Sequence, residues 1–152
     1  MPIIPIDDYL PEERVVDLSS STKVGAIEEL CAILGASEAV GDAAALRTAV
    51  LAREDVMSTG IGLGIAVPHA KIDSVKEFAL ALGRSRTGIE FNALDGRPVH
   101  IVVLIAGPDD RQARYLQILA SVTLRLKREE VRRALLEAAG PAEMAAVLRL
   151  DA

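Results

Sequence analysis

Aromatic side chains are scarce in this chain of 152 residues. Phenylalanine, tyrosine and tryptophan together make up 3% of the sequence, and tryptophan is absent. Proteins that bind single-stranded nucleic acids stack bases on such rings, so the composition disfavours that class of ligand. The formal net charge of −5 points the same way, because phosphate backbones attract basic surfaces. We therefore expect an aliphatic core and no nucleic-acid partner.

Cysteine is nearly absent as well. The single Cys31 excludes a disulfide within the chain, and its apolar neighbours at helical spacing, Ile27, Leu30 and Leu34, predict a buried structural thiol. The sequence has no run of about 18 apolar residues, the length a membrane span needs. Its first residues lack the cationic segment and apolar run of a signal peptide. We therefore expect a cytoplasmic protein without membrane insertion.

What the chain does contain is a large apolar fraction. Hydrophobic residues make up 51% of the sequence, which is typical of a compact core and not of disorder. A chain of this length buries most of its apolar surface in one unit. We therefore predict a single domain over residues 1–152.

Helical and strand patterns alternate along the sequence. Val99 to Ala106 is the clearest strand, since its residues are β-branched and nearly all apolar. The first two helices have N-cap candidates at 19–22 and at Asp42. This alternation predicts an α/β fold with a buried, at least partly parallel sheet flanked by helices. Further strands are expected at 14–18, 65–67 and 78–82, and helices at 23–34, 42–53, 113–126, 129–139 and 142–150.

The most informative segment spans residues 58 to 70 and reads Ser-Thr-Gly-Ile-Gly-Leu-Gly-Ile-Ala-Val-Pro-His-Ala. It places one of only two histidines, His69, directly after a strand that stops at Pro68. Backbone N–H groups in a glycine-rich loop form anion-binding nests, and hydroxyl groups add further donors. An imidazole beside such a loop predicts a phosphohistidine. The candidate phosphate-binding residues in this segment are Ser58, Thr59, Gly60, Gly62 and Gly64.

Other motifs do not fit this segment. A dinucleotide loop needs glycines between a strand and a helix with a final G-x-x-G spacing, whereas Ile65 stands at that last position. A Walker Gly-Lys-Ser/Thr and a G-x-S-x-G elbow are both absent. His69, His100 and Asp73 are too few for a metal site. Two alternatives stay open: a histidine that only hydrogen bonds a neighbouring carbonyl, and an unrelated small-ligand module that uses the glycine loop.

The segment from Thr59 to His69 resembles the phosphorylation-site signature of a known family. This family is the fructose/mannitol-type enzyme IIA of the bacterial phosphoenolpyruvate-dependent sugar phosphotransferase system, and it includes nitrogen-regulatory paralogues. The resemblance covers nearly the whole chain. Further matching segments are the strand and helix from Leu18 to Leu34, the Ala52-Arg53-Glu54 triplet, Phe91 to Pro108, and Tyr115 to Leu119.

This resemblance implies an α/β domain with a mixed, mostly parallel sheet and helices on both faces. It also implies that His69 accepts a phosphoryl group from an HPr-type carrier and passes it to a IIB domain or protein, without a cofactor. Arg53 matches the family's active-site arginine, whose guanidinium neutralises phosphate charge; a helix C-terminal cap is its alternative role. His100 is interpreted as a hydrogen-bonded strand residue, with a contribution to the site as the alternative.

Three positions depart from the family pattern. Tyr115 stands where a second active-site histidine is common and is a candidate accessory residue. Leu63 replaces a usual Asn or Glu, and Ala70 replaces a usual glycine. Loss of one donor at a charged transition state lowers a rate by about 10²–10³. The alternative to a phosphoryl carrier is therefore a nitrogen-regulatory or degenerate IIA that binds partner proteins according to its phosphorylation state.

Overall fold

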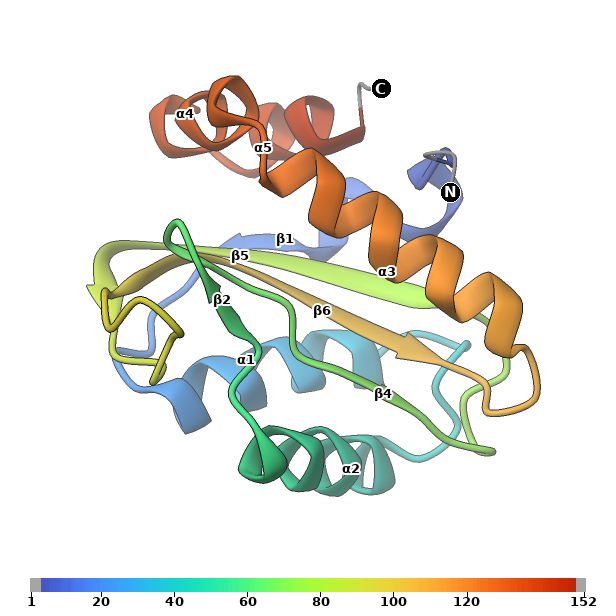
Figure 1. Ribbon diagram of the computed structural model, residues 1–152. Helices are drawn as coiled ribbons and strands as arrows, with labels where there is room; N and C mark the ends of the chain where they lie inside the picture. Colours follow the sequence, from blue (N-terminus) through green and yellow to red (C-terminus); the bar gives the residue numbers. More distant parts are fainter. Residues whose placement is uncertain (1–3, 150–152) are drawn as a thin grey trace.

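A computed structural model describes residues 4–149, in which helices cover both faces of a six-stranded mixed sheet (Figure 1). The strand order is β1-β5-β6-β3-β2, and β4 also pairs with β6. The strands are β1 (Val15–Asp17), β2 (Gly60–Gly62), β3 (Ile65–Ala66), β4 (His69–Lys71), β5 (Ala79–Ile89) and β6 (Val99–Gly107). The helices are α1 (Lys23–Gly35), α2 (Ala43–Val56), α3 (Gln112–Leu126), α4 (Glu129–Glu137) and α5 (Pro141–Arg149), with the short 3₁₀ helices η1 (Asp7–Tyr9) and η2 (Glu12–Arg14) before β1.

The central strands are almost wholly apolar because both faces of the sheet are covered. In β6, Ile101, Val103 and Ile105 belong to one core cluster, whereas Val102 and Leu104 belong to the other. Successive side chains of a strand point to opposite faces, so this strand contributes to two cores. Figure 1 shows α1 and α2 against one face and α3, α4 and α5 against the other. The predicted arrangement of helices on both faces is confirmed.

Both helices of the first layer begin at the predicted caps. The Thr22 hydroxyl accepts a hydrogen bond from the backbone N–H of Gly25 at 3.1 Å, and the Asp42 carboxylate accepts one from Ala45 at 3.0 Å. Each bond satisfies an N–H that has no partner within the helix. The second cap fixes the start of α2, which packs against β4.

The sheet is mixed, as predicted. β1 pairs with β5 in the parallel sense, and so do β3 and β4 with β6, while the longest pairing, β5 with β6, is antiparallel. Pairing with β6 therefore fixes how far apart β3 and His69 lie along the sheet. Ile65 pairs with Ile101, and His69 pairs with Ile105.

β5 is longer than the sequence predicted, because it runs from Ala79 to Ile89 instead of ending at Leu82. The apolar pattern breaks at Arg84, yet this side chain is only 1% exposed. Its guanidinium donates to the carboxylate of Asp17 on β1 and to two backbone carbonyls at the end of α4. These hydrogen bonds offset the cost of burying the guanidinium charge. The strand therefore continues past Arg84, although the apolar sequence pattern ends before it.

The short strands β2 and β4 were not predicted, since each has three residues, too few to establish an alternating pattern. The helix expected at 142–150 is confirmed as α5 through Arg149, and Leu150 lies outside the described residues. None of the helices between residues 4 and 149 combines the length and the apolar character needed to cross a membrane.

Candidate functional site

A shallow hollow of about 270 Å³ lies where α2, β4 and the first turn of α3 meet. Three residues singled out in the sequence come together here: Arg53 from α2, His69 from β4 and Tyr115 from α3. Pairing with β6 brings β4 into the sheet beside α2, which explains how segments far apart in the sequence share one site. The hollow is lined by Ala49, Arg53, His69, Ala70, Lys71 and Tyr115.

The His69 imidazole is held in one tautomer by a nearby backbone carbonyl. Its Nδ1 lies 2.8 Å from the carbonyl oxygen of Val67, so the ring donates from Nδ1 and its lone pair is on Nε2. Partial burial lowers the pKa of His69, and the charge of Arg53 acts in the same direction. The Val67 hydrogen bond and Glu54 oppose this shift without reversing it. The imidazole is therefore neutral near pH 7, which is its nucleophilic form.

An NMR titration of the histidine ring signals measures the pKa of His69 and so tests these electrostatic effects. We expect a pKa for His69 below the ordinary value of about 6.5, because burial and Arg53 both disfavour the imidazolium. Arg53→Gln should raise that pKa part of the way back, whereas Arg97→Gln, at an exposed position outside the hollow, should leave it unchanged. A pKa at or above 6.5 in the unaltered protein would contradict the assigned environment.

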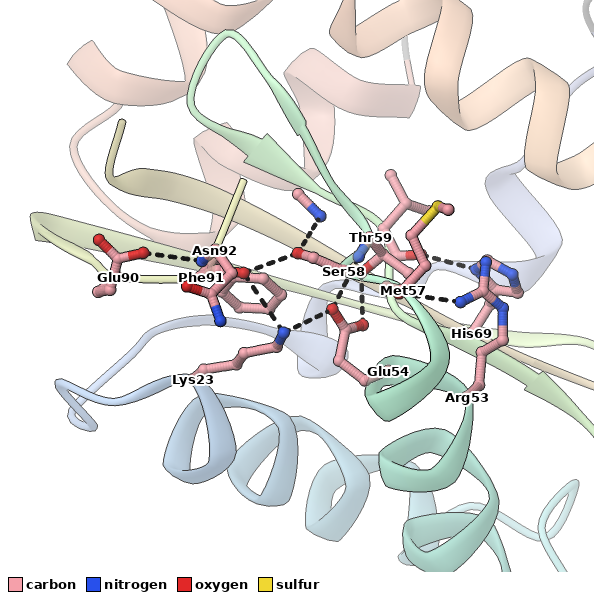
Figure 2. A network of polar contacts seen from close by, with 12 residues as sticks. Lys23, Arg53, Glu54, Met57, Ser58, Thr59, His69, Glu90, Phe91 and Asn92 are labelled. Carbon is pink, nitrogen blue, oxygen red and sulfur yellow. Dashed lines mark hydrogen bonds and ion pairs between the residues drawn. The ribbon is translucent and has the colours of Figure 1, made fainter. Parts of the chain in front are cut away.

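Arg53 lies in the last turn of α2, where a positive charge is favourable to the helix dipole. Its Nη1 donates to the carbonyl oxygen of Met57 at 3.0 Å, and Figure 2 shows its guanidinium beside the His69 ring. One side chain therefore satisfies a carbonyl near the helix end and lines the hollow. The two roles that the sequence left open for Arg53 are compatible in this geometry.

Tyr115 is buried and meets His69 edge to face. The ring centroids are 5.9 Å apart at an interplanar angle of 62°. Burial raises the pKa of Tyr115 to about 12, so its phenol is neutral and able to donate a hydrogen bond. The ammonium of Lys71 lies over the same ring, 5.2 Å from its centroid. Lys71 was not singled out in the sequence, and its place two residues after the histidine in a strand is the signal that identifies it.

A glycine-rich turn closes the β2–β3 hairpin. The backbone φ angles are +94° at Gly62, +62° at Leu63 and +77° at Gly64, which glycine adopts freely and leucine only with strain. Ile65, directly after this turn, and His69 pair with residues of β6 that are four positions apart. That separation is about 13 Å along a strand. The structure therefore does not bring Gly62 and Gly64 to the imidazole.

The polar groups before this hairpin are engaged within the protein. The Ser58 hydroxyl donates to the carbonyl oxygen of Phe91 at 2.6 Å and accepts from the backbone N–H of Gly60 at 3.0 Å. Thr59 is buried, and both its N–H and its hydroxyl donate to the carboxylate of Glu54 at 2.7 Å. Ser58, Thr59 and Gly60 therefore stabilise the backbone of this segment, and these donors bond to groups of the protein itself.

Glu54 is the centre of a buried polar network (Figure 2). Its carboxylate accepts both bonds from Thr59 and forms an ion pair with Lys23 at 3.0 Å. The Lys23 ammonium also donates to the carbonyl oxygen of Phe91 at 3.3 Å and lies 5.0 Å from the centroid of that ring. The network therefore joins α1, the end of α2 and the segment before β2.

A chain of hydrogen bonds leads from Glu54 to the imidazole. Glu54 accepts from Thr59, the Thr59 carbonyl accepts from the Val67 N–H at 3.1 Å, and the Val67 carbonyl accepts from His69 Nδ1. Sequence reasoning assigned no role to Glu54. The signal was present, because Leu46, Val50 and Glu54 follow each other at i,i+4 spacing and so share the buried face of α2.

His100 lies at the opposite end of β6 from the hollow. It is five residues before Ile105, the register partner of His69, which is about 16 Å along the strand. Its Nδ1 lies 2.9 Å from the carbonyl oxygen of Ser85, as the interpretation of a hydrogen-bonded strand residue requires. Within residues 4–149, no group of three or more His, Cys, Asp or Glu side chains is placed to hold a metal ion.

Known proteins share this sequence pattern and this fold. The family model described as phosphoenolpyruvate-dependent sugar phosphotransferase system, EIIA 2, matches residues 9–150. The fructose-specific EIIA component of Haloferax volcanii is 37% identical over 139 residues, which are 91% of this chain and 90% of that protein.

Two further similarities extend the comparison. The fructose-specific EIIABC component of Bacillus subtilis is 41% identical over 123 residues, which are 81% of this chain but span only 19% of that protein. Among solved structures, the nitrogen regulatory protein IIA-Ntr of Neisseria meningitidis superposes with a TM-score of 0.86 at 28% identity, covering 94% of this chain and 98% of that one.

Proposed function

Because this chain belongs to the EIIA 2 family of the phosphoenolpyruvate-dependent sugar phosphotransferase system, we propose that Nε2 of His69 is the atom that carries the phosphoryl group. The observation that supports this proposal most directly is the Nδ1 hydrogen bond to Val67, since it leaves the lone pair on Nε2. The same nitrogen belongs to a ring that lines a hollow with two cationic side chains, Arg53 and Lys71.

The proposed step exchanges one phosphorus–nitrogen bond for another. The lone pair of Nε2 attacks the phosphorus of a phosphohistidine on an HPr-type carrier, and the bond from that phosphorus to the carrier's nitrogen breaks. The proton stays on Nδ1, where it is donated to the Val67 carbonyl oxygen throughout, so His69 needs no separate base. Such transfers depend mainly on positioning and charge neutralisation, to which the fixed tautomer and the Arg53 guanidinium contribute.

The acceptor of the phosphoryl group would be a IIB domain or protein in the cytoplasm. Support comes from the Bacillus subtilis relative, whose name assigns components A, B and C to one chain. The present chain corresponds to a small part of that protein, so a IIB acceptor would have to dock on the surface around the hollow. Neutral Tyr115 and half-buried His69 line that hollow.

A second function is favoured by the similarity to the Neisseria meningitidis nitrogen regulatory protein. In this case the phosphorylation state of His69 acts as a regulatory signal. It adds about two negative charges to the hollow and so changes the affinity of a partner protein. An adduct that forms on His69 but does not pass to any cognate IIB would favour this function over the carrier.

Intact-protein mass spectrometry after incubation with phosphoenolpyruvate, enzyme I and a cognate HPr tests the proposal. We expect an acid-labile phosphate adduct that is lost in His69→Ala and retained in His100→Ala, because His100 is engaged with Ser85 far from the hollow. Tyr115→His, which restores a second imidazole, should keep or increase the labelling rate. Labelling that survives the loss of His69 would overturn the site assignment.

A further inference from the structure

Lys71 and His69 share one side of β4. Side chains two residues apart in a strand point to the same face, and both residues line the hollow. Lys71 is exposed, so its ammonium reaches the hollow without a large desolvation cost. A phosphoryl group on the imidazole would therefore form within reach of this lysine.

Two contacts from the first turn of α3 hold the lysine in place. Its ammonium donates to the side-chain oxygen of Gln112 and lies 5.2 Å from the centroid of the Tyr115 ring. An aromatic face attracts a cation through its quadrupole. Since the same Tyr115 ring meets His69 edge to face, one side chain orients both the nucleophile and a cation.

We propose that Lys71, held by Tyr115 and Gln112, is the positioning cation that neutralises the phosphoryl group on His69. This inference rests on the proposed function and deepens it. It also assigns a role to the residue that replaces the family's second histidine. The neutral Tyr115 ring holds the Lys71 ammonium in place, and the lysine supplies the positive charge near the phosphoryl group.

Arg53 alone does not provide the same neutralisation. Its guanidinium donates from Nη1 to Met57, which fixes it at the α2 side of the hollow. Lys71 approaches from the β4 and α3 side. A dianionic phosphoryl group on Nε2 would thus lie in a hollow lined by two cations from different elements, and both would stabilise its negative charge during transfer.

The test measures the rate of phosphoryl uptake from a phosphorylated HPr-type carrier under single-turnover conditions. We expect Lys71→Met to lower this rate about tenfold, the effect of one lost charge contact in a largely solvated site, and Lys71→Arg to restore most of it. Tyr115→Phe keeps the ring and should lose less than Tyr115→Leu. Lys127→Met, an exposed lysine at the far end of α3, is the matched control.

A second readout separates charge neutralisation from a merely structural role. In a ³¹P NMR titration of the phosphorylated protein, Lys71→Met should raise the pKa of the phosphoryl group relative to the unaltered chain, because a nearby cation favours the dianion. The Lys127→Met variant should not change it. Equal uptake rates and equal phosphoryl pKa values in Lys71→Met and the unaltered chain would overturn this inference. A lack of labelling in the unaltered chain would instead refute the proposed function.

Discussion

Replacing Glu54 with alanine is expected to lower the free energy of unfolding by about 2–4 kcal/mol. The substitution leaves the buried N–H and hydroxyl of Thr59 without their acceptor and removes the carboxylate paired with Lys23. That carboxylate is 3% exposed and the lysine side chain 20% exposed, so water replaces the lost partner poorly. Urea titration monitored by circular dichroism measures the change.

The same substitution should slow phosphoryl uptake in the fraction that remains folded. Glu54 fixes Thr59, which is bonded to Val67, whose carbonyl sets the tautomer of His69. Loosening the first bond allows the imidazole to leave the orientation that presents Nε2. We expect an uptake rate at least tenfold lower, which corresponds to about 1.4 kcal/mol of transition-state stabilisation.

Asp55→Ala is the matched control for Glu54, because it removes the neighbouring acidic side chain at an exposed position of the same helix. Its effect on stability should be within about 0.5 kcal/mol. If the two variants were equally stable and equally fast, the network in Figure 2 would have no role in holding the site.

Arg84→Leu is expected to destabilise the protein by about 2–4 kcal/mol. The guanidinium of Arg84 donates to the Asp17 carboxylate at 2.7 and 3.0 Å and to the carbonyl oxygens of Leu135 and Ala138, both at 2.8 Å. Leucine fills part of the space but leaves two buried carbonyls without donors. The arginine therefore fastens the end of α4 to the β1–β5 edge of the sheet.

Arg86→Leu controls for this change on the same strand. Arg86 is 59% exposed and approaches Asp17 only to 3.9 Å, so its loss should cost less than about 0.5 kcal/mol. The hydrogen bonds from Arg84 lower the pKa of Asp17, so the pair stabilises the fold above the ordinary aspartate pKa near 4. That contribution is lost as the pH falls through the lowered value. A stability difference between Arg84→Leu and Arg86→Leu below about 1 kcal/mol at pH 7 would contradict the structural role of Arg84.

The sequence predicted those features that depend on local pattern. Apolar periodicity located the five α-helices, residue type indicated the Asp42 cap, and a β-branched apolar run indicated strand β6. Each of these features is specified by residues close together in the chain. The glycine-to-histidine segment and the resemblance it carries indicated the family, which the match over residues 9–150 shows. The assignment of the phosphoryl group to His69 stays a prediction.

Features that depend on contacts between residues far apart in the sequence could not be predicted from the local pattern. Arg84 interrupts an apolar strand pattern, and its burial is favourable because distant groups bind it: Asp17, 67 residues earlier, and the carbonyls of Leu135 and Ala138. The glycines suggested an anion nest beside His69, whereas the register with β6 makes them a hairpin turn that lies away from it. The position of the Lys71 ammonium could not be predicted from β4 alone, because it donates to Gln112, which belongs to α3.

We propose Nε2 of His69 as the phosphorylated atom. The most direct measurement is ³¹P–¹⁵N NMR on the phosphorylated protein labelled with ¹⁵N at histidine. We predict phosphorus coupled to Nε2 of His69, with Nδ1 still protonated and bonded to Val67. Phosphorus coupled to Nδ1, or to a nitrogen of His100, would contradict the account.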